Sequence, residues 1–274
     1  MTFNILHDSM RSLNPPWSVR RPLVMETIRS TQADVVCLQE VSPRQLEHLS
    51  HDLLEYELIP GEPTGLTRFP SGNGLLALVR PIFGDYIDRG EYCPILIRRG
   101  GLTCANEGSD RIKSSRAGLA QSWAGSGMPH VITWVNLEGS GRRFTLYNTH
   151  LGIVPWNWAR TGTELLTLLD RDWSGEPQIL VGDFNALRRG PLFRRLIRTQ
   201  ENGTPVVHDA WHEARTRERG PGSFHWGCGL PWPRVDYILL RPRCEVSRAA
   251  IVGERIGGIF PSDHYAVVAD LELS

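Results

Sequence analysis

The chain carries no excess of charge of either sign. Its 30 Lys and Arg residues balance 30 Asp and Glu residues, so the formal net charge at pH 7 is +0. The overall balance therefore gives no long-range attraction to a polyanion. A basic strip on one face would still permit such a partner, because net charge says nothing about how charge is distributed.

Closely spaced cysteine pairs and a recognisable secretory leader are also absent from this sequence. The 5 cysteines are an odd number and contain no Cys-x-x-Cys pair, which argues against a zinc knot or a fully paired disulfide framework. Cys93 with Cys104, or Cys228 with Cys244, could still pair in an exported protein. No basic segment followed by an apolar run opens the chain. We therefore expect a cytoplasmic protein without a transmembrane segment, or a secreted one if a leader was removed ahead of residue 1.

What is present is the composition of an ordinary globular protein. The chain has 274 residues, of which 41% are hydrophobic and 22% charged, enough to bury a sizeable core. No internal repeat, low-complexity tract or linker-like shift in composition divides it. We expect a single domain over residues 1–274, and a monomer.

Short apolar runs alternate with longer amphipathic segments along the chain. The predicted strands are Phe3–Leu6, Val35–Leu38, Leu75–Val79, Val131–Leu137, Phe144–Leu151, Gln178–Val181, Val235–Leu240 and Tyr265–Leu271. One predicted helix begins at Pro22. The others cover Pro43–Leu54, Glu164–Leu169 and Leu192–Ile197. The segment Pro81–Gly127, rich in Gly, Arg and Ser, is predicted to form surface loops. Strands outnumber helices and one glycine-rich hairpin is antiparallel, which favours a mixed α/β sandwich over a purely parallel sheet.

Polar side chains stand at the ends of several of these apolar strands. They are Asn4, Glu40, His150, Asp183, Asn185, Asp236, Asp263 and His264. A carboxylate beside a buried strand costs free energy unless it is paired or binds a metal ion. Together these groups would form a site for a hard cation, Mg²⁺ or Mn²⁺ with Ca²⁺ as a further option. Such a site suits in-line attack of water on a phosphodiester or phosphomonoester. Taken singly, each residue has a commoner structural explanation, such as a turn-capping Asp or a hydrogen-bonded core His.

The local sequences around these residues resemble those of the endonuclease/exonuclease/phosphatase superfamily, in the family's order along the chain. The matching segments are Phe3-Asn4-Ile5-Leu6, Leu38-Gln39-Glu40-Val41, Gly72-Asn73-Gly74, Asn148-Thr149-His150-Leu151, Gly182-Asp183-Phe184-Asn185, Arg234-Val235-Asp236-Tyr237-Ile238 and Ser262-Asp263-His264-Tyr265. The resemblance implies a DNase I-like fold of class α+β: a four-layer α/β sandwich in which helices flank two packed, mixed β-sheets.

The resemblance also implies a role for each site residue. Glu40, with Asn4 and Asp263, would hold a divalent cation. Asp183, positioned by Asn185, would align and deprotonate water. His150 and His264 would stabilise charge on the phosphoryl oxygens, with Asp236 orienting one of the two histidines.

The resemblance does not name the substrate, and one departure from the family bears on it. Many family nucleases carry an acid two positions after the opening Asn, where this chain has Leu6. The balanced charge and the Trp-rich loops favour a small-molecule or lipid phosphoester. The alternatives are a DNA or RNA nuclease and a non-catalytic binding protein. The predicted substrate-binding residues are Asn73, Trp156, Trp158, Arg160 and Trp226.

Overall fold

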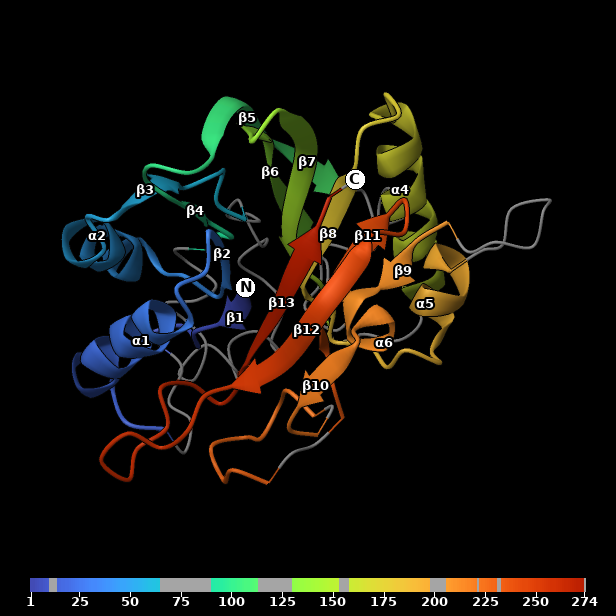
Figure 1. The fold of residues 1–274 in the computed structure, drawn as a ribbon. Coiled ribbons are helices and arrows are strands. Elements are labelled where there is room, and N and C mark those ends of the chain that lie inside the picture. The colour runs from blue at the N-terminus through green and yellow to red at the C-terminus, as the bar shows by residue number, and fades with distance from the viewer. Residues whose placement is uncertain are drawn as a thin grey trace, which may run out of the picture.

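Two β-sheets form the centre of the structure, and helices lie on their outer sides (Figure 1). The computed structural model describes residues 1–9, 14–64, 90–112, 130–152, 158–197, 206–220, 222–230 and 233–273. The predicted strand Leu75–Val79 lies outside these residues. Among the helices described, none combines the length and the hydropathy needed to cross a bilayer.

The first sheet has seven strands in the order β10-β12-β13-β1-β2-β4-β3. Their bounds are β1 Thr2–Asn4, β2 Val35–Gln39, β3 Tyr56–Ile59, β4 Ile95–Arg98, β10 Thr216–Glu218, β12 Glu245–Val252 and β13 Ala266–Glu272. β1 runs parallel to β2, with Asn4 opposite Gln39 in the register, and antiparallel to β13. The C-terminal ends of β1 and β2 therefore lie side by side at the same end of the sheet.

The second sheet has six strands in the order β5-β6-β7-β8-β11-β9. Their bounds are β5 Thr103–Ile112, β6 His130–Gly139, β7 Arg142–His150, β8 Gln178–Asp183, β9 His208–Asp209 and β11 Asp236–Arg241. β7 and β8 are parallel, and β11 is antiparallel to β8. Each sheet thus mixes parallel and antiparallel pairs, as the sequence predicts.

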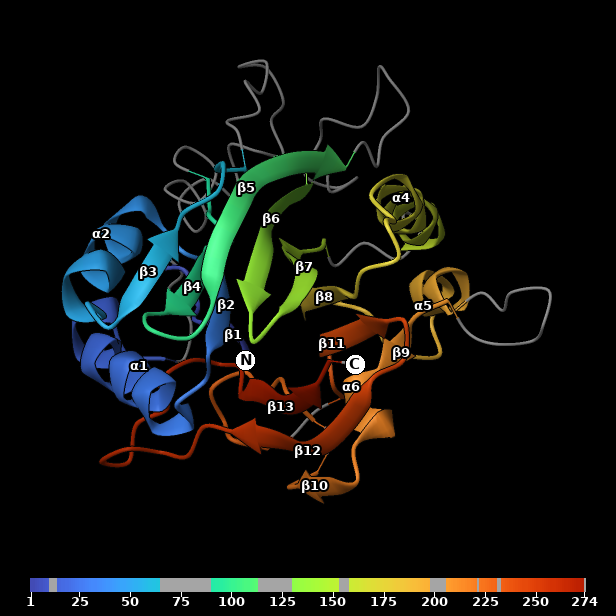
Figure 2. The same cartoon turned by 45° about the horizontal axis from the view of Figure 1, so that its top comes forward.

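Three groups of buried apolar residues hold the layers together. One lies between the sheets, with Cys37 and Ile95 from the first sheet and Val135 and Val181 from the second. A second group packs α1 Trp17–Thr31 and α2 Pro43–Asp52 onto the first sheet. The third packs α4 Trp158–Arg171 and α5 Pro191–Leu196 onto the second sheet. Figure 2 shows the same order of layers from another side, with the short helix α6 Ala210–Glu213 near β11. The predicted four-layer sandwich is confirmed.

Two sequence predictions about elements were wrong. The region Pro81–Gly127 is not all loop, because it contains β4 and β5. β5 is an edge strand in which Ile112 alone is buried, so it needs few apolar residues and gives a weak pattern. The first helix begins at Trp17 rather than Pro22, and Pro22 lies inside it.

Candidate active site

Three predicted site residues lie side by side at one end of the central strands of the second sheet. In the register, His150 at the end of β7 stands beside Asp183 at the end of β8, and Asp183 stands opposite Asp236 at the start of β11. Because β11 is antiparallel to β8, the start of β11 lies beside the end of β8. Three residues far apart in the sequence are thereby placed side by side.

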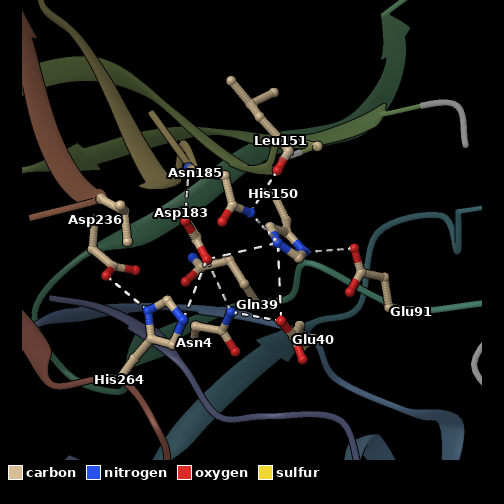
Figure 3. Close-up of polar contacts among 12 residues, drawn as sticks. Asn4, Gln39, Glu40, Glu91, His150, Leu151, Asp183, Asn185, Asp236 and His264 are labelled. Carbon is tan, nitrogen blue, oxygen red and sulfur yellow. Dashed lines mark hydrogen bonds and ion pairs between the residues drawn. The ribbon is translucent and has the colours of Figure 1, made fainter. Parts of the chain in front are cut away.

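The first sheet supplies Asn4 and Glu40 to the same place. The Asn4 amide nitrogen donates to Glu40 Oε1 at 2.9 Å and to Asp183 Oδ2 at 3.0 Å, which links the two sheets (Figure 3). Glu40 has a left-handed backbone with φ 56°, and its Oε2 accepts from the main-chain N–H of His7 at 3.2 Å. Burial opposes ionisation of Glu40, but nearby His150 and the Asn4 hydrogen bond outweigh it and lower its pKa. Glu40 is therefore an anion at neutral pH, as a cation ligand must be.

His150 is held between carboxylates. Its Nδ1 donates to Glu91 Oε1 at 2.8 Å, and its Nε2 lies 3.6 Å from Asp183 Oδ2. The Asn185 amide nitrogen is 3.0 Å from Nε2, which accepts this hydrogen bond when the ring is neutral. Burial lowers the pKa of His150, but the charge and hydrogen bond of Glu91 outweigh burial and raise it to about 10. The ring can thus carry positive charge beside the cluster.

His264 forms a second imidazole–carboxylate pair on the opposite side of Asp183. Its Nδ1 donates to Asp236 Oδ2 at 2.9 Å, and its Nε2 lies 3.6 Å from Asp183 Oδ2. Burial lowers the pKa of His264, but Asp236 and Asp183 outweigh burial and raise it well above its usual value. This arrangement leaves Nε2 as the nitrogen directed toward the centre of the cluster.

Asp183 lies at the centre of the cluster and is almost fully buried. Its Oδ1 accepts from the main-chain N–H of Asn185 at 2.9 Å. Burial, followed by the charge of Asp236, raises the pKa of Asp183 to about 6. A carboxylate with a pKa near the working pH suits a group that takes a proton from water.

The end of β8 and the residues directly after it need an unusual backbone to present Asp183 and Asn185. Asn185 has φ 48°, and its amide also donates to the main-chain oxygen of Leu151 at 2.7 Å. Gly182 has φ 144°, and a Cβ there would lie 1.9 Å from the main-chain oxygen of Thr149. Glycine at position 182 therefore allows β8 to approach β7 closely enough to align their end residues.

Gly182→Ala is expected to destabilise the protein by about 3 kcal/mol or more, because it adds backbone strain to a steric clash. Gly141→Ala is the matched control, since Gly141 has φ 74° but no atom within 4 Å of its added Cβ. The control should cost only about 1 kcal/mol. Urea unfolding measures both, and equal losses would mean that the close approach at Gly182 is unimportant.

Asp263 reaches the cluster through the segment that precedes His264. Ser262 Oγ donates to the main-chain oxygen of Asn4 at 2.7 Å and so joins this segment to the end of β1. Burial raises the pKa of Asp263, and the neighbouring charge of His264 opposes that rise. The charge of Glu40 acts in the same direction as burial.

The acidic groups form a pocket of ligands suited to a cation. Ligand atoms of Asp183, Asp236 and His264 all lie within 4.8 Å of one another. Asp236 Oδ1 is buried and has no hydrogen-bond partner among the described residues, so it has a free lone pair to offer a ligand. Carboxylate oxygens are the donors that Mg²⁺, Mn²⁺ and Ca²⁺ prefer, so the donor set fits a hard divalent ion.

The predicted substrate-binding residues fall into three groups. Asn73 and Trp156 lie outside the described residues. Trp158 packs against the core beneath the second sheet, and its indole N–H donates to the main-chain oxygen of Gly152 at 3.1 Å. Arg160 is exposed on α4 and pairs with Glu164 at 3.0 Å. The structure directs neither side chain into the polar cluster.

Trp226 lies beside the cluster with its side chain open to solvent. It is 57% exposed, and its ring centroid is 5.4 Å from that of Phe224. The Phe224 ring is in turn 4.8 Å from the ring of His264. A short series of aromatic rings therefore leads from the polar cluster to the surface.

Glu91 is a site residue that the sequence reasoning missed. It is 3% exposed and lies just before β4, in the segment interpreted as loop. The apolar run Ile95-Leu96-Ile97 is the signal that could have identified it, because it predicts a buried strand with an acid shortly before it.

Comparison with known proteins gives a family match over almost the whole chain. The model of the Endonuclease/Exonuclease/phosphatase family matches residues 1–264. Nocturnin of Drosophila melanogaster is 22% identical over 291 aligned residues, which cover 94% of this chain and 42% of that protein. The chain thus spans about two fifths of the length of this relative.

Two solved structures show the same fold at low sequence identity. A mannosyl-6-phosphatase of Bacteroides thetaiotaomicron superposes with a TM-score of 0.77 at 18% identity, covering 99% of this chain and 98% of that one. D. rerio TDP2, complexed with a single-strand DNA product, superposes with a TM-score of 0.65 at 19% identity, covering 97% and 95%. At these identities the likeness establishes the fold alone.

Proposed function

The chain belongs to the endonuclease/exonuclease/phosphatase family, whose members are hydrolases acting on phosphoesters, and from that premise we propose its own reaction. It is a divalent-metal-dependent phosphoesterase that hydrolyses a small-molecule or lipid phosphoester by in-line attack of water. The observation that carries the proposal is the position of Asp183. Its Oδ2 accepts from Asn4 at 3.0 Å and lies 3.6 Å from the Nε2 atoms of both His150 and His264.

We place the metal ion beside the residues assigned to the proton chemistry, whose ligand atoms lie within 4.8 Å of one another: Asp183, Asp236 and His264. Glu40 and Asp263 would hold the ion, and Asn4 would join them through its Oδ1 after its amide turns, since its nitrogen is the atom that faces Glu40 here. Mg²⁺ is the first choice, with Mn²⁺ and Ca²⁺ as alternatives. When bound, a divalent cation polarises a phosphoryl oxygen and offsets the negative charge of the substrate. The low pKa of Glu40 keeps this carboxylate charged for that purpose.

The remaining groups divide the proton chemistry between them. Asp183, aligned by the Asn185 N–H, takes the proton of the attacking water. His264 Nε2 and His150 Nε2 face the position where charge develops on the phosphoryl oxygens, and one of them can protonate the leaving oxygen. Asp236 and Glu91 each accept from the Nδ1 of one histidine, and so fix the orientation of both rings.

Exposed apolar side chains near the site support a substrate with an apolar or flat part. Among the described residues, Leu187, Trp226 and Leu230 are 49%, 57% and 68% exposed. Leu187 follows Asn185 by two residues, and the other two share the loop that begins at Phe224. An acyl chain or a planar ring linked to the phosphoester would contact these side chains and remove them from water.

A nuclease is the second candidate, and the exposed indole of Trp226 favours it. An aromatic side chain beside a phosphodiester site can stack a nucleobase, and the DNA product bound to the TDP2 structure shows that the fold accommodates such a ligand. The balanced net charge argues against it. Binding of a polyanion would weaken steeply with added salt, whereas hydrolysis of a small phosphoester would not.

A panel of phosphoesters tests the proposal. It comprises p-nitrophenyl phosphate, bis-p-nitrophenyl phosphate, a sugar 6-phosphate, sphingomyelin, phosphoinositides, RNA, and single- and double-stranded DNA, each assayed with Mg²⁺ at low and high salt. We expect the highest kcat/KM on a small or lipid phosphoester, with little dependence on salt. Fastest turnover on a nucleic acid, falling steeply with salt, would establish the nuclease instead. No turnover of any member would contradict both.

A further inference from the structure

A buried arginine lies directly behind the proposed metal ligands. Arg20, on α1, is 1% exposed. The hydrogen bonds that it makes with other described residues all end on main-chain carbonyl oxygens. They run from Nε to Pro15 at 2.9 Å, from Nη1 to Ile5 at 2.6 Å and Pro261 at 2.9 Å, and from Nη2 to Leu6 at 3.0 Å.

These carbonyls belong to the two segments that carry proposed ligands. Ile5 and Leu6 follow Asn4 directly, and Pro261 stands two residues before Asp263. Leu6 has a left-handed backbone with φ 57°, a conformation unfavourable for a leucine. One guanidinium therefore fixes the exit from β1 and the approach to Asp263 relative to each other.

The charge of Arg20 is also directed at the site. Burial lowers its pKa to about 10, while the carboxylates of Asp263 and Glu40 oppose that fall, so the side chain remains a cation at neutral pH. Burying a guanidinium costs free energy that four hydrogen bonds and the Trp17 ring, 5.6 Å away, offset. An apolar side chain of similar size would fill the space at lower cost. The positive charge of Arg20 therefore does more than fill space: it reduces the repulsion between the carboxylates of Glu40 and Asp263 when no metal ion is bound.

We infer that Arg20 is a positioning residue that preorganises the metal site: it holds the segments bearing Asn4 and Asp263 and balances the charge of Glu40 and Asp263 until a divalent cation binds. The inference rests on the proposed metal-dependent function. It predicts that loss of the guanidinium geometry weakens binding of the ion itself, beyond any effect on folding.

Arg20→Lys tests this, with Arg21→Lys as the matched control. Lysine keeps the charge but cannot span the carbonyls that the planar guanidinium contacts. Arg21 is the next residue on α1, and both of its hydrogen bonds to Asp52 are 2.6 Å long. Mn²⁺ would be titrated into the metal-free proteins and the free ion followed by electron paramagnetic resonance. We expect a Kd at least tenfold higher for Arg20→Lys and within twofold of wild type for Arg21→Lys, even where both variants lose thermal stability.

A dose response adds a second readout. Turnover of Arg20→Lys should recover as the Mn²⁺ concentration is raised, which a purely structural defect would not show. A Kd within twofold of wild type in folded Arg20→Lys would overturn the inference. If the wild-type protein binds no Mn²⁺, the proposed metal-dependent function is wrong, and so is the role inferred for Arg20.

Ser262→Ala provides the test if Arg20→Lys does not fold. It removes the hydroxyl that joins Asp263's segment to the main-chain oxygen of Asn4 at 2.7 Å and that lies 3.3 Å from Asp263 Oδ1, and it leaves the guanidinium in place. We expect weaker Mn²⁺ binding here as well. An unchanged Kd would show that holding the two segments together does not set the affinity for the ion, and the inference would be wrong.

Discussion

Replacing Asp183 with Asn should lower kcat by about 10²- to 10⁴-fold, the contribution typical of a positioned general base. Asparagine has nearly the same shape, and its side-chain oxygen can still accept from the Asn185 N–H. It cannot take a proton from water. The measurement is steady-state turnover of the best substrate, with Mg²⁺ at saturation so that weaker metal binding does not contribute.

The same variant should be less stable than the wild type at pH 7 without metal. The amide nitrogen that replaces Oδ2 faces the Asn4 amide nitrogen, a second donor, and both histidines lose their neighbouring carboxylate. The raised pKa of Asp183, about 6, means that removing its charge offsets part of this loss. Thermal unfolding in EDTA checks this. A kcat within tenfold of the wild type in the folded variant would exclude Asp183 as the base.

Replacing His264 with Gln should also lower kcat by about 10²- to 10⁴-fold. Asp236 acts through His264, since its Oδ2 accepts from His264 Nδ1 at 2.9 Å. Residues that work as one unit give non-additive losses. The double variant His264→Gln/Asp236→Asn should therefore be no slower than His264→Gln alone. Losses that multiply would mean that Asp236 contributes independently of His264.

The double variant should unfold less readily than the single variant His264→Gln, although it is no faster as a catalyst. His264→Gln leaves the Asp236 carboxylate buried beside Asp183 without its cationic partner, a loss of about 3–5 kcal/mol for a buried pair. Adding Asp236→Asn removes the stranded charge, so the double variant should be more stable than the single one. Chemical unfolding of both proteins measures the difference.

The strand-end residues could be predicted because their placement follows from local pattern. His150 and Asp183 each end an apolar run, and parallel neighbours bring such ends together. The fold class follows in the same way from alternating strands and helices. The register that sets Asp183 opposite Asp236 is not visible in either segment, and it appears only when β8 and β11 are paired.

Other features depend on contacts that no local pattern encodes. The apolar run of β4 marks a buried strand shortly after Glu91, but nothing in that run shows that Glu91 contacts His150 on the other sheet. Arg20 lies on the same helix face as buried Trp17, but the four carbonyls that make burial of a guanidinium possible come from segments that its own helix does not reveal. Trp158 sits in a Trp-rich segment that indicated a substrate loop, whereas its indole packs on the core. Sequence does not tell which way such a ring turns.

The most direct test of the account is metal removal and restoration on one activated phosphodiester. Hydrolysis of bis-p-nitrophenyl phosphate would be followed for the wild-type protein in EDTA, after adding back Mg²⁺ or Mn²⁺, and for Asp183→Asn under the same conditions. The buried carboxylates around Asp183 predict turnover that disappears in EDTA, returns with the divalent ion and stays absent in the variant. Turnover that persists unchanged in EDTA, or that Asp183→Asn retains, would contradict a metal-dependent phosphoesterase centred on this cluster.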